Sequence, residues 1–188
     1  MHLAHKFLLS LALLGPVAGH TQDKAPFNLQ ELAPGVYAAI DREGRAGANA
    51  GIVIGRDAVL VVDSLYKEAA SQALLAAVRK LSSLPIRYLV NTHHHIDHVA
   101  GNRLFADSGA TVVAQRNVAG WIQSENLRLL GGEQASPAAQ AQVANLLQPQ
   151  LSFDRRMSLD LGGRRVELQH QLGHTGGDTV VWVPDAQV

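Results

Sequence analysis

The sequence predicts an α/β fold in which strands and helices alternate along one domain. Short β-branched runs at residues 58–63 and 179–183 have the length and composition of strands. Between them, apolar residues at 67–81 recur with the period of an amphipathic helix. A third buried run, at residues 86–90, leads directly into a cluster of histidines. Strands and helices mixed in this way pack as layers.

The first half of the chain contains four expected strands and one helix. A first strand is expected at residues 35–40, and a hairpin at 51–54 and 58–63, joined by a turn that begins with glycine. Residues 67–81 form the amphipathic helix, because their apolar side chains lie on one face. A proline then precedes the buried strand at 86–90.

The second half continues the alternation. Residues 111–114 are expected to form a strand, and 118–130 a helix. A second helix is expected at 136–147, where serine provides an N-cap and proline occupies the first turn. Alternating apolar residues on both sides of a Gly-Gly pair predict a hairpin at 157–168, and residues 179–183 form the last strand.

The composition excludes several classes of protein. The chain has 188 residues, of which 47% are hydrophobic and 17% charged, as in globular domains rather than disordered chains. Sixteen basic residues balance sixteen acidic ones, so there is no basic footprint for nucleic acid. The absence of cysteine excludes disulfides, thiolate metal sites and cysteine nucleophiles.

The first 19 residues are expected to be a signal peptide. Lys6 precedes an apolar run at residues 7–18 that is interrupted only by Ser10, too short for a spanning helix. Cleavage after Gly19 would release a domain of residues 20–188 with no stable membrane insertion. We therefore expect export, into the periplasm if the protein is bacterial. A buried N-terminal helix and an uncleaved anchor are the alternatives.

The histidines indicate a metal site. Side chains two apart in an extended chain point the same way, so His93, His95 and Asp97 can converge, and a turn at Asp97 can bring His98 to the same place. Imidazole and carboxylate suit zinc, and hydrolytic zinc commonly has three protein ligands and an open position. His174, in a glycine-flanked loop before a strand, is the third candidate ligand. Asp97 and His98 would begin a second site.

The other histidines have different expected roles. His94 is expected to face away from the metal, with a role behind the ligands or at the surface. His170, on the second hairpin strand, is expected to be a surface or hydrogen-bonded residue. A tag-like metal-binding tract is the alternative to a built site, but such tracts lie at termini in polar surroundings, whereas this cluster follows a buried strand.

Residues 92–102 resemble the HxHxDH signature of the metallo-β-lactamase superfamily. The resemblance extends over most of the chain after the leader, because residues 61–64, 173–176 and 181–185 match further landmarks in the family's order. It implies an αββα sandwich with the metals at one edge of the two sheets. A generic metallohydrolase is favoured over a true lactamase.

The resemblance also implies roles for individual residues. The first metal is held by three histidines, His93, His95 and His174. Asp97 and His98 contribute to the second metal, and Asp97 also positions the attacking water. Asp63, at the end of a strand, hydrogen-bonds and orients the ligand loop.

The chain departs from the family pattern at its end. Family members continue to a strand with an Asp or Cys ligand and then to a final histidine, whereas no residue after Asp185 here can coordinate a metal. We therefore expect a chain that lacks its C-terminal portion, with an incomplete second metal site and an incomplete second half of the sandwich.

The expected function is that of a zinc-dependent hydrolase. It uses a metal-bound hydroxide on a carbonyl-type small-molecule substrate: a β-lactam, a thioester or a related ester. The alternative is a catalytically inactive metal-binding remnant. One or two zinc ions are expected, while iron or manganese in place of zinc and the oligomeric state stay open. Neutral charge and export disfavour the nuclease branch, and His95 disfavours the flavodiiron branch, which typically has Glu there.

Overall fold

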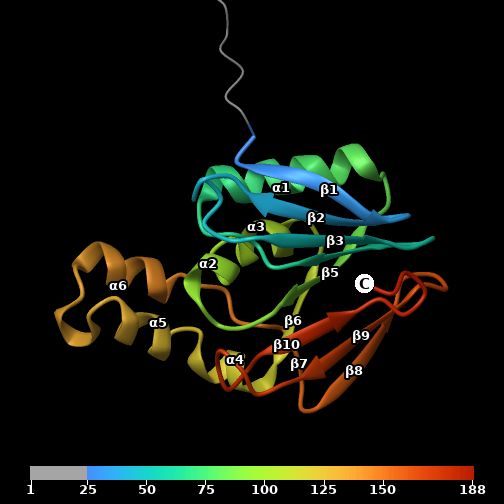
Figure 1. Cartoon of the computed structure of the whole chain (residues 1–188). Helices are drawn as coiled ribbons and strands as arrows, with labels where there is room; N and C mark the ends of the chain where they lie inside the picture. The colour runs from blue at the N-terminus through green and yellow to red at the C-terminus, as the bar shows by residue number, and fades with distance from the viewer. Residues whose placement is uncertain (1–24) are drawn as a thin grey trace, which may run out of the picture.

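The computed structural model describes residues 25–188, which form two facing β-sheets with helices around them (Figure 1). The predicted signal peptide at residues 1–19 lies outside the described residues. None of the helices within residues 25–188 has the length and apolar character needed to cross a membrane.

The larger sheet has seven strands in sequence order. They are β1 (Phe27–Ala33), β2 (Val36–Asp41), β3 (Ala50–Ile54), β4 (Val59–Val62), β5 (Ile86–Asn91), β6 (Thr111–Gln115) and β7 (Leu151–Phe153). The pairs from β1 to β4 are antiparallel, whereas β4, β5, β6 and β7 run parallel. The carboxyl ends of these parallel strands therefore meet at one edge, which is where the histidine cluster begins.

Helices cover one face of the larger sheet. They are α1 (Glu68–Leu81) and α3 (Asn102–Asp107), with the single turn α2 (Ile96–Val99) before α3. Leu74 and Val78 of α1 and Phe105 of α3 pack with Val61 and Leu89 of the sheet. The next residues along the strands, such as Leu60 and Val90, point to the opposite face. Because both faces are covered, the central strands carry consecutive apolar residues, at 59–62 in β4 and 112–114 in β6.

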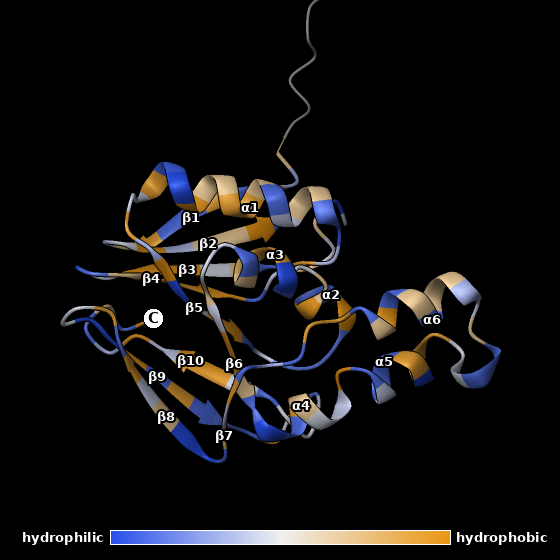
Figure 2. Ribbon diagram, turned by 180° about the vertical axis from the view of Figure 1, so that it is seen from behind, coloured by the Kyte–Doolittle hydropathy of each residue, from blue (hydrophilic) through white to orange (hydrophobic). Residues whose placement is uncertain are grey.

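The smaller sheet covers that opposite face. Its strands are β8 (Arg156–Asp160), β9 (Arg165–His170) and β10 (Thr179–Trp182), in the antiparallel order β10-β9-β8. Leu159, Val166 and Leu168 pack against Leu60 and Val90 in a second core between the sheets. Strands of both sheets carry hydrophobic colour (Figure 2). The predicted hairpin is confirmed: Gly162 and Gly163 form its turn at φ +86° and +87°. The layers agree with the expected sandwich, with a small second sheet.

The chain segment that connects β6 to β7 forms a helical arm, which projects beside the two sheets (Figures 1 and 2). It consists of α4 (Arg116–Trp121), α5 (Ser124–Leu129), a 3₁₀ turn (Gly132–Gln134) and α6 (Pro137–Ala144). The prediction of one helix at 118–130 is wrong, because the chain breaks between α4 and α5. There the side chains of Ser124 and Asn126 hydrogen-bond to the carbonyls of Gly120 and Ile122 and compete with a continuous helix.

The second predicted helix also differs from the structure. It begins as expected, since the Oγ of Ser136 accepts a hydrogen bond from the backbone N–H of Ala139. It ends at Ala144 rather than at residue 147. Beyond this point Leu146 packs in a small cluster with Val99, and the carbonyl of Leu147 accepts a hydrogen bond from Asn102. Tertiary contacts therefore end the helix early.

Candidate metal centre

The histidine cluster leaves the carboxyl end of β5 and passes into a helical turn. His95 is the N-cap of α2, with extended angles of φ −60° and ψ 145°. His93 and His95 thus lie in extended chain, as expected from their spacing. Asp97 differs from the expectation, because it lies in the first turn of α2 rather than in the extended segment. The helical turn places His98 directly after it.

The third histidine comes from the smaller sheet. The backbone N–H of Thr179, at the start of β10, donates to the carbonyl of Thr92 over 2.8 Å, which joins the two sheets beside the cluster. The loop before β10 carries His174, whose Nε2 lies 3.1 Å from Nδ1 of His95. One ring nitrogen each from His93, His95 and His174 can be chosen so that all lie within 4.8 Å of one another. The structure therefore brings together the three histidines of the predicted first site.

Three side chains fix the position of the His174 loop. The carboxylate of Asp178 accepts hydrogen bonds from the backbone N–H of Thr175, at 2.9 and 3.0 Å, and from its hydroxyl. From α4, the amide of Asn117 donates to the carbonyl of Gly176 over 2.7 Å. The ring of Trp121 lies against Gly176, where an added Cβ would be 2.6 Å from Cη2. Sequence reasoning missed Asn117 and Trp121, because nothing local links α4 to a loop more than 50 residues away.

Two of the three converging histidines have lowered pKa values. Burial, followed by repulsion from the neighbouring imidazoles, lowers the pKa of His93 from 6.5 to about 3. The same causes, burial first, lower the pKa of His95. At neutral pH these rings therefore carry no charge, and each has a nitrogen lone pair, which is the form that binds a metal.

Asp63 connects the strand ends to the histidine segment. It lies just after β4 in the left-handed region, at φ 59°, a conformation that Asp and Asn tolerate better than most residues. Its Oδ1 accepts from the backbone N–H of Thr92 at 2.8 Å, and its Oδ2 accepts from the Thr92 hydroxyl at 2.7 Å. Oδ2 also lies 2.7 Å from Nδ1 of His98. This side chain is thus placed to orient the segment.

Asp97 and His98 form a pair next to the three histidines. Nε2 of His98 lies 3.5 Å from Oδ2 of Asp97, and the His98 ring centroid is 4.1 Å from that of His93. Burial lowers the pKa of His98, but hydrogen bonding and charge attraction by Asp63 outweigh it, so that the net pKa is raised. The two residues lie outside the group of three that converge on one point.

A buried polar network supports the backbone of this turn. The carbonyl of His98 accepts hydrogen bonds from the backbone N–H of Ser64 at 2.9 Å and from its hydroxyl at 3.0 Å. The Ser64 hydroxyl also lies 3.0 Å from Oδ1 of Asn102, which accepts from the amide of Asn91 at 2.9 Å. Because these groups are buried and satisfied, they hold the turn rigidly.

Two further histidines of the described residues differ in their surroundings. Of the two positions expected for His94, behind the predicted ligands or at the surface, the surface position is excluded, because the residue is 5% exposed. Its ring makes edge contacts with His95 and Trp121, at centroid distances of 4.7 and 5.8 Å. His170 is half-buried at the end of β9, with Nδ1 3.1 Å from the carbonyl of Asp178.

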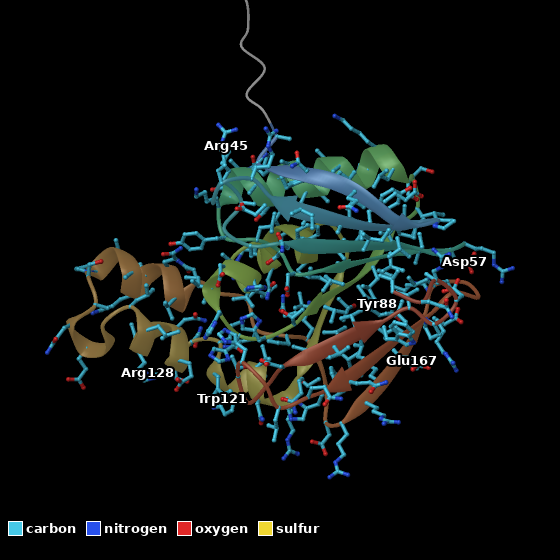
Figure 3. All side chains as sticks on the ribbon, viewed as in Figure 1. Arg45, Asp57, Tyr88, Trp121, Arg128 and Glu167 are labelled. Carbon is cyan, nitrogen blue, oxygen red and sulfur yellow. The ribbon has the colours of Figure 1, made fainter. Side chains whose placement is uncertain are left out.

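A cavity of about 370 Å³ opens beside the three histidines. One wall comes from the ligand loops, through His94, His95 and His174. The other wall comes from the helical arm, through Trp121 of α4 and Glu125 and Arg128 of α5. Trp121 and Arg128 are labelled in Figure 3. A small molecule in this cavity would contact both walls.

Comparison with known proteins agrees with this geometry. The sequence profile described as "Metallo-beta-lactamase superfamily" matches residues 44–188. The chain belongs to this superfamily. The match includes both histidine loops, and the αββα class follows from it.

Solved structures share the fold. A metallo-beta-lactamase from Pontibacter korlensis matches with a TM-score of 0.62 and 18% identity, covering 85% of this chain and 67% of that one. A second match, described as the first B3 metallo-beta-lactamase with an active-site glutamic acid, has a TM-score of 0.62 and 23% identity. It covers 84% of this chain and 57% of that one. This chain therefore spans roughly three fifths to two thirds of these structures' length.

Proposed function

We propose that this protein is a zinc-dependent hydrolase that acts on a carbonyl-type small molecule, namely a β-lactam, a thioester or a related ester. The observation that carries the proposal is the convergence of three imidazoles, two from the end of β5 and one from the loop before β10. Membership of the metallo-β-lactamase superfamily supports a metal-dependent hydrolase in general. We also propose that the protein is exported, on the strength of its leader sequence.

The residues present fit a zinc ion. Tetrahedral zinc with Zn–N bonds of 2.0–2.1 Å separates two ligand nitrogens by about 3.3 Å, and the nitrogens of His95 and His174 are 3.1 Å apart. His93, His95 and His174 would hold the ion, and Asp97 with His98 would contribute to a second. When bound, zinc lowers the pKa of water from 15.7 to about 7 and polarises a carbonyl oxygen.

The chain's own residues orient the reacting groups. Asp63 holds both Thr92 and His98, so the histidine segment after β5 keeps a fixed position relative to the end of β4. The side chain of Asp97 is 40% exposed beside the imidazoles. In our proposal its carboxylate accepts a hydrogen bond from the attacking water and directs the water toward the substrate carbonyl. The cavity between the His174 loop and the helical arm binds the rest of the substrate.

The second candidate function is a metal-binding protein without activity. It is favoured by one observation: Asp97 and His98 lie outside the converging group, so one ion is held more completely than two. The two candidates differ in turnover. The zinc content of the purified protein is measured first, and hydrolysis of a chromogenic β-lactam and of a glutathione thioester follows. Zinc together with turnover of either substrate, lost in His174→Ala, supports the hydrolase, whereas one zinc per chain and no turnover supports the inactive protein.

A further inference from the structure

We propose that His94 is a substrate-positioning residue, whose Nε2–H donates a hydrogen bond to a carboxylate on the acyl side of the substrate. The inference rests on the proposed hydrolase function and specifies its substrate class. His94 lies between two predicted metal ligands in sequence but does not belong to the converging group. It lines the cavity beside that group.

The first observation is an unpartnered polar atom. His94 is 5% exposed, and its Nδ1 is buried without a hydrogen-bond partner within the described part of the chain. Its backbone is fixed, because the amide of Asn126 donates to its carbonyl over 2.6 Å. Buried polar groups without partners are rare in native proteins and call for an explanation. A ring retained here for packing alone would be more stable as an apolar one.

The burial of Nδ1 of His94 indicates which tautomer of the ring is present. A neutral imidazole carries its proton on one nitrogen and a lone pair on the other. An orphaned buried N–H is rarer in native structures than an unsatisfied acceptor, so the proton belongs on Nε2 rather than on Nδ1. Nε2 also makes no hydrogen bond within residues 25–188, and it is the ring nitrogen that is not enclosed. His94 therefore presents a free donor at the cavity.

The opposite wall indicates what accepts this hydrogen bond. Arg128 is bound through Nε to Oε2 of Glu125 at 2.8 Å, and its side chain is 68% exposed. Its Nη groups make no further hydrogen bond among the described residues, so they too can donate at the cavity rim. Trp121 lines the same cavity and supplies a flat apolar surface. Hydrogen-bond donors together with an aromatic ring suit a substrate with an apolar segment that ends in a carboxylate.

The binding of two thiols tests the preference for a carboxylate without relying on turnover. Thiolate binds zinc, so 3-mercaptopropionate and 1-propanethiol share an anchor and differ in the carboxylate. Isothermal titration calorimetry of the zinc-loaded protein is expected to show at least about tenfold tighter binding of 3-mercaptopropionate, as for a charge-assisted hydrogen bond. His94→Phe should remove this difference, with the affinity for 1-propanethiol and the zinc content unchanged. His94→Gln should keep most of it, because its amide also donates.

The proposal is overturned if His94→Phe keeps the preference, or if Arg128→Ala removes it while His94→Phe does not. A second measurement does not need the metal. Nitrogen-15 NMR of the zinc-free protein should show the His94 proton on Nε2, and a proton on Nδ1 contradicts the proposal. Absence of zinc binding in the wild type contradicts the hydrolase function instead, so the two failures are distinguishable.

Discussion

Asp63 and His98 are 35 residues apart in sequence, yet Oδ2 of the first lies 2.7 Å from Nδ1 of the second. Because Nδ1 is engaged with the carboxylate, Nε2 is left facing Asp97. The same carboxylate accepts two hydrogen bonds from Thr92. One buried side chain at the end of β4 therefore determines both the ring orientation of His98 and the direction in which the chain leaves β5.

Replacement of Asp63 by asparagine is expected to destabilise the protein. Asparagine tolerates the positive φ of this position, so the backbone is preserved, but its amide cannot accept from both Thr92 and His98. The free energy of unfolding should fall by about 1.5–3 kcal/mol, as for lost hydrogen bonds to a charged group. Urea denaturation measures it. Asp154→Asn, at an exposed ion pair with Arg116, is the matched control and should change stability by less than about 1 kcal/mol.

Substitutions of the adjacent residues His94 and His95 are expected to differ in their effect on zinc binding. His95→Ala removes one of three converging nitrogens and should abolish tight zinc binding, whereas His94→Ala should leave it nearly unchanged. Zinc content after dialysis and a competition titration with a chelator measure the difference. An equal loss of affinity in both variants would show that the ligand assignment is wrong.

Gly101 is expected to be intolerant of a side chain. A Cβ at this position would lie 2.4 Å from the carbonyl oxygen of Ser64 and 2.5 Å from Oγ of Ser71. Gly101→Ala should therefore lower the free energy of unfolding by about 1–3 kcal/mol through overpacking. Gly120→Ala, in α4 with no atom within 4 Å of its Cβ, should be neutral or stabilising by up to about 1 kcal/mol. Thermal unfolding of both variants gives the comparison, and equal Tm values would contradict it.

The loop after β2 should contribute pH-dependent stability. Burial alone would raise the pKa of Asp41, but hydrogen bonds from the backbone N–H groups of Ala46, Gly44 and Gly47 outweigh it and lower the pKa below 3.8. A carboxyl group with a lowered pKa in the folded state stabilises the protein above its unfolded pKa, and this contribution is lost as the pH falls through the folded pKa. Asp41→Asn should thus be less stable than wild type at pH 7. The difference should shrink below pH 3.8, as measured by denaturation across this range.

Sequence reasoning identified the elements that have a strong period. The stripe of α1 and the β-branched runs of β4 and β10 are encoded locally, so their positions were predicted within one or two residues. β1 was not predicted, because its apolar alternation ends after Gln30; it is an edge strand with five consecutive exposed residues. β7 has only three residues. The break between α4 and α5 depends on the side chains of Ser124 and Asn126, which a helical period does not reveal.

The residues of the candidate site also differ in whether a local sequence pattern identifies them. His93 and His95 follow from their spacing at the end of a strand, and His174 from its glycine-flanked loop. Asn117 and Trp121 hold that loop from a separate helix, and no local pattern identifies them. For His94 the sequence left a position behind the predicted ligands and one at the surface open, and the helical arm that covers it is brought there only in the folded chain.

The hydrogen bond from Thr179 to Thr92 joins the two sheets where the imidazoles meet. A cation held there would contact residues from both sheets, so it would bind the native chain and not the unfolded one. At a free concentration one hundred times its dissociation constant, such a ligand adds about 2.7 kcal/mol to stability. Metal starvation would therefore shorten the lifetime of this protein against proteases.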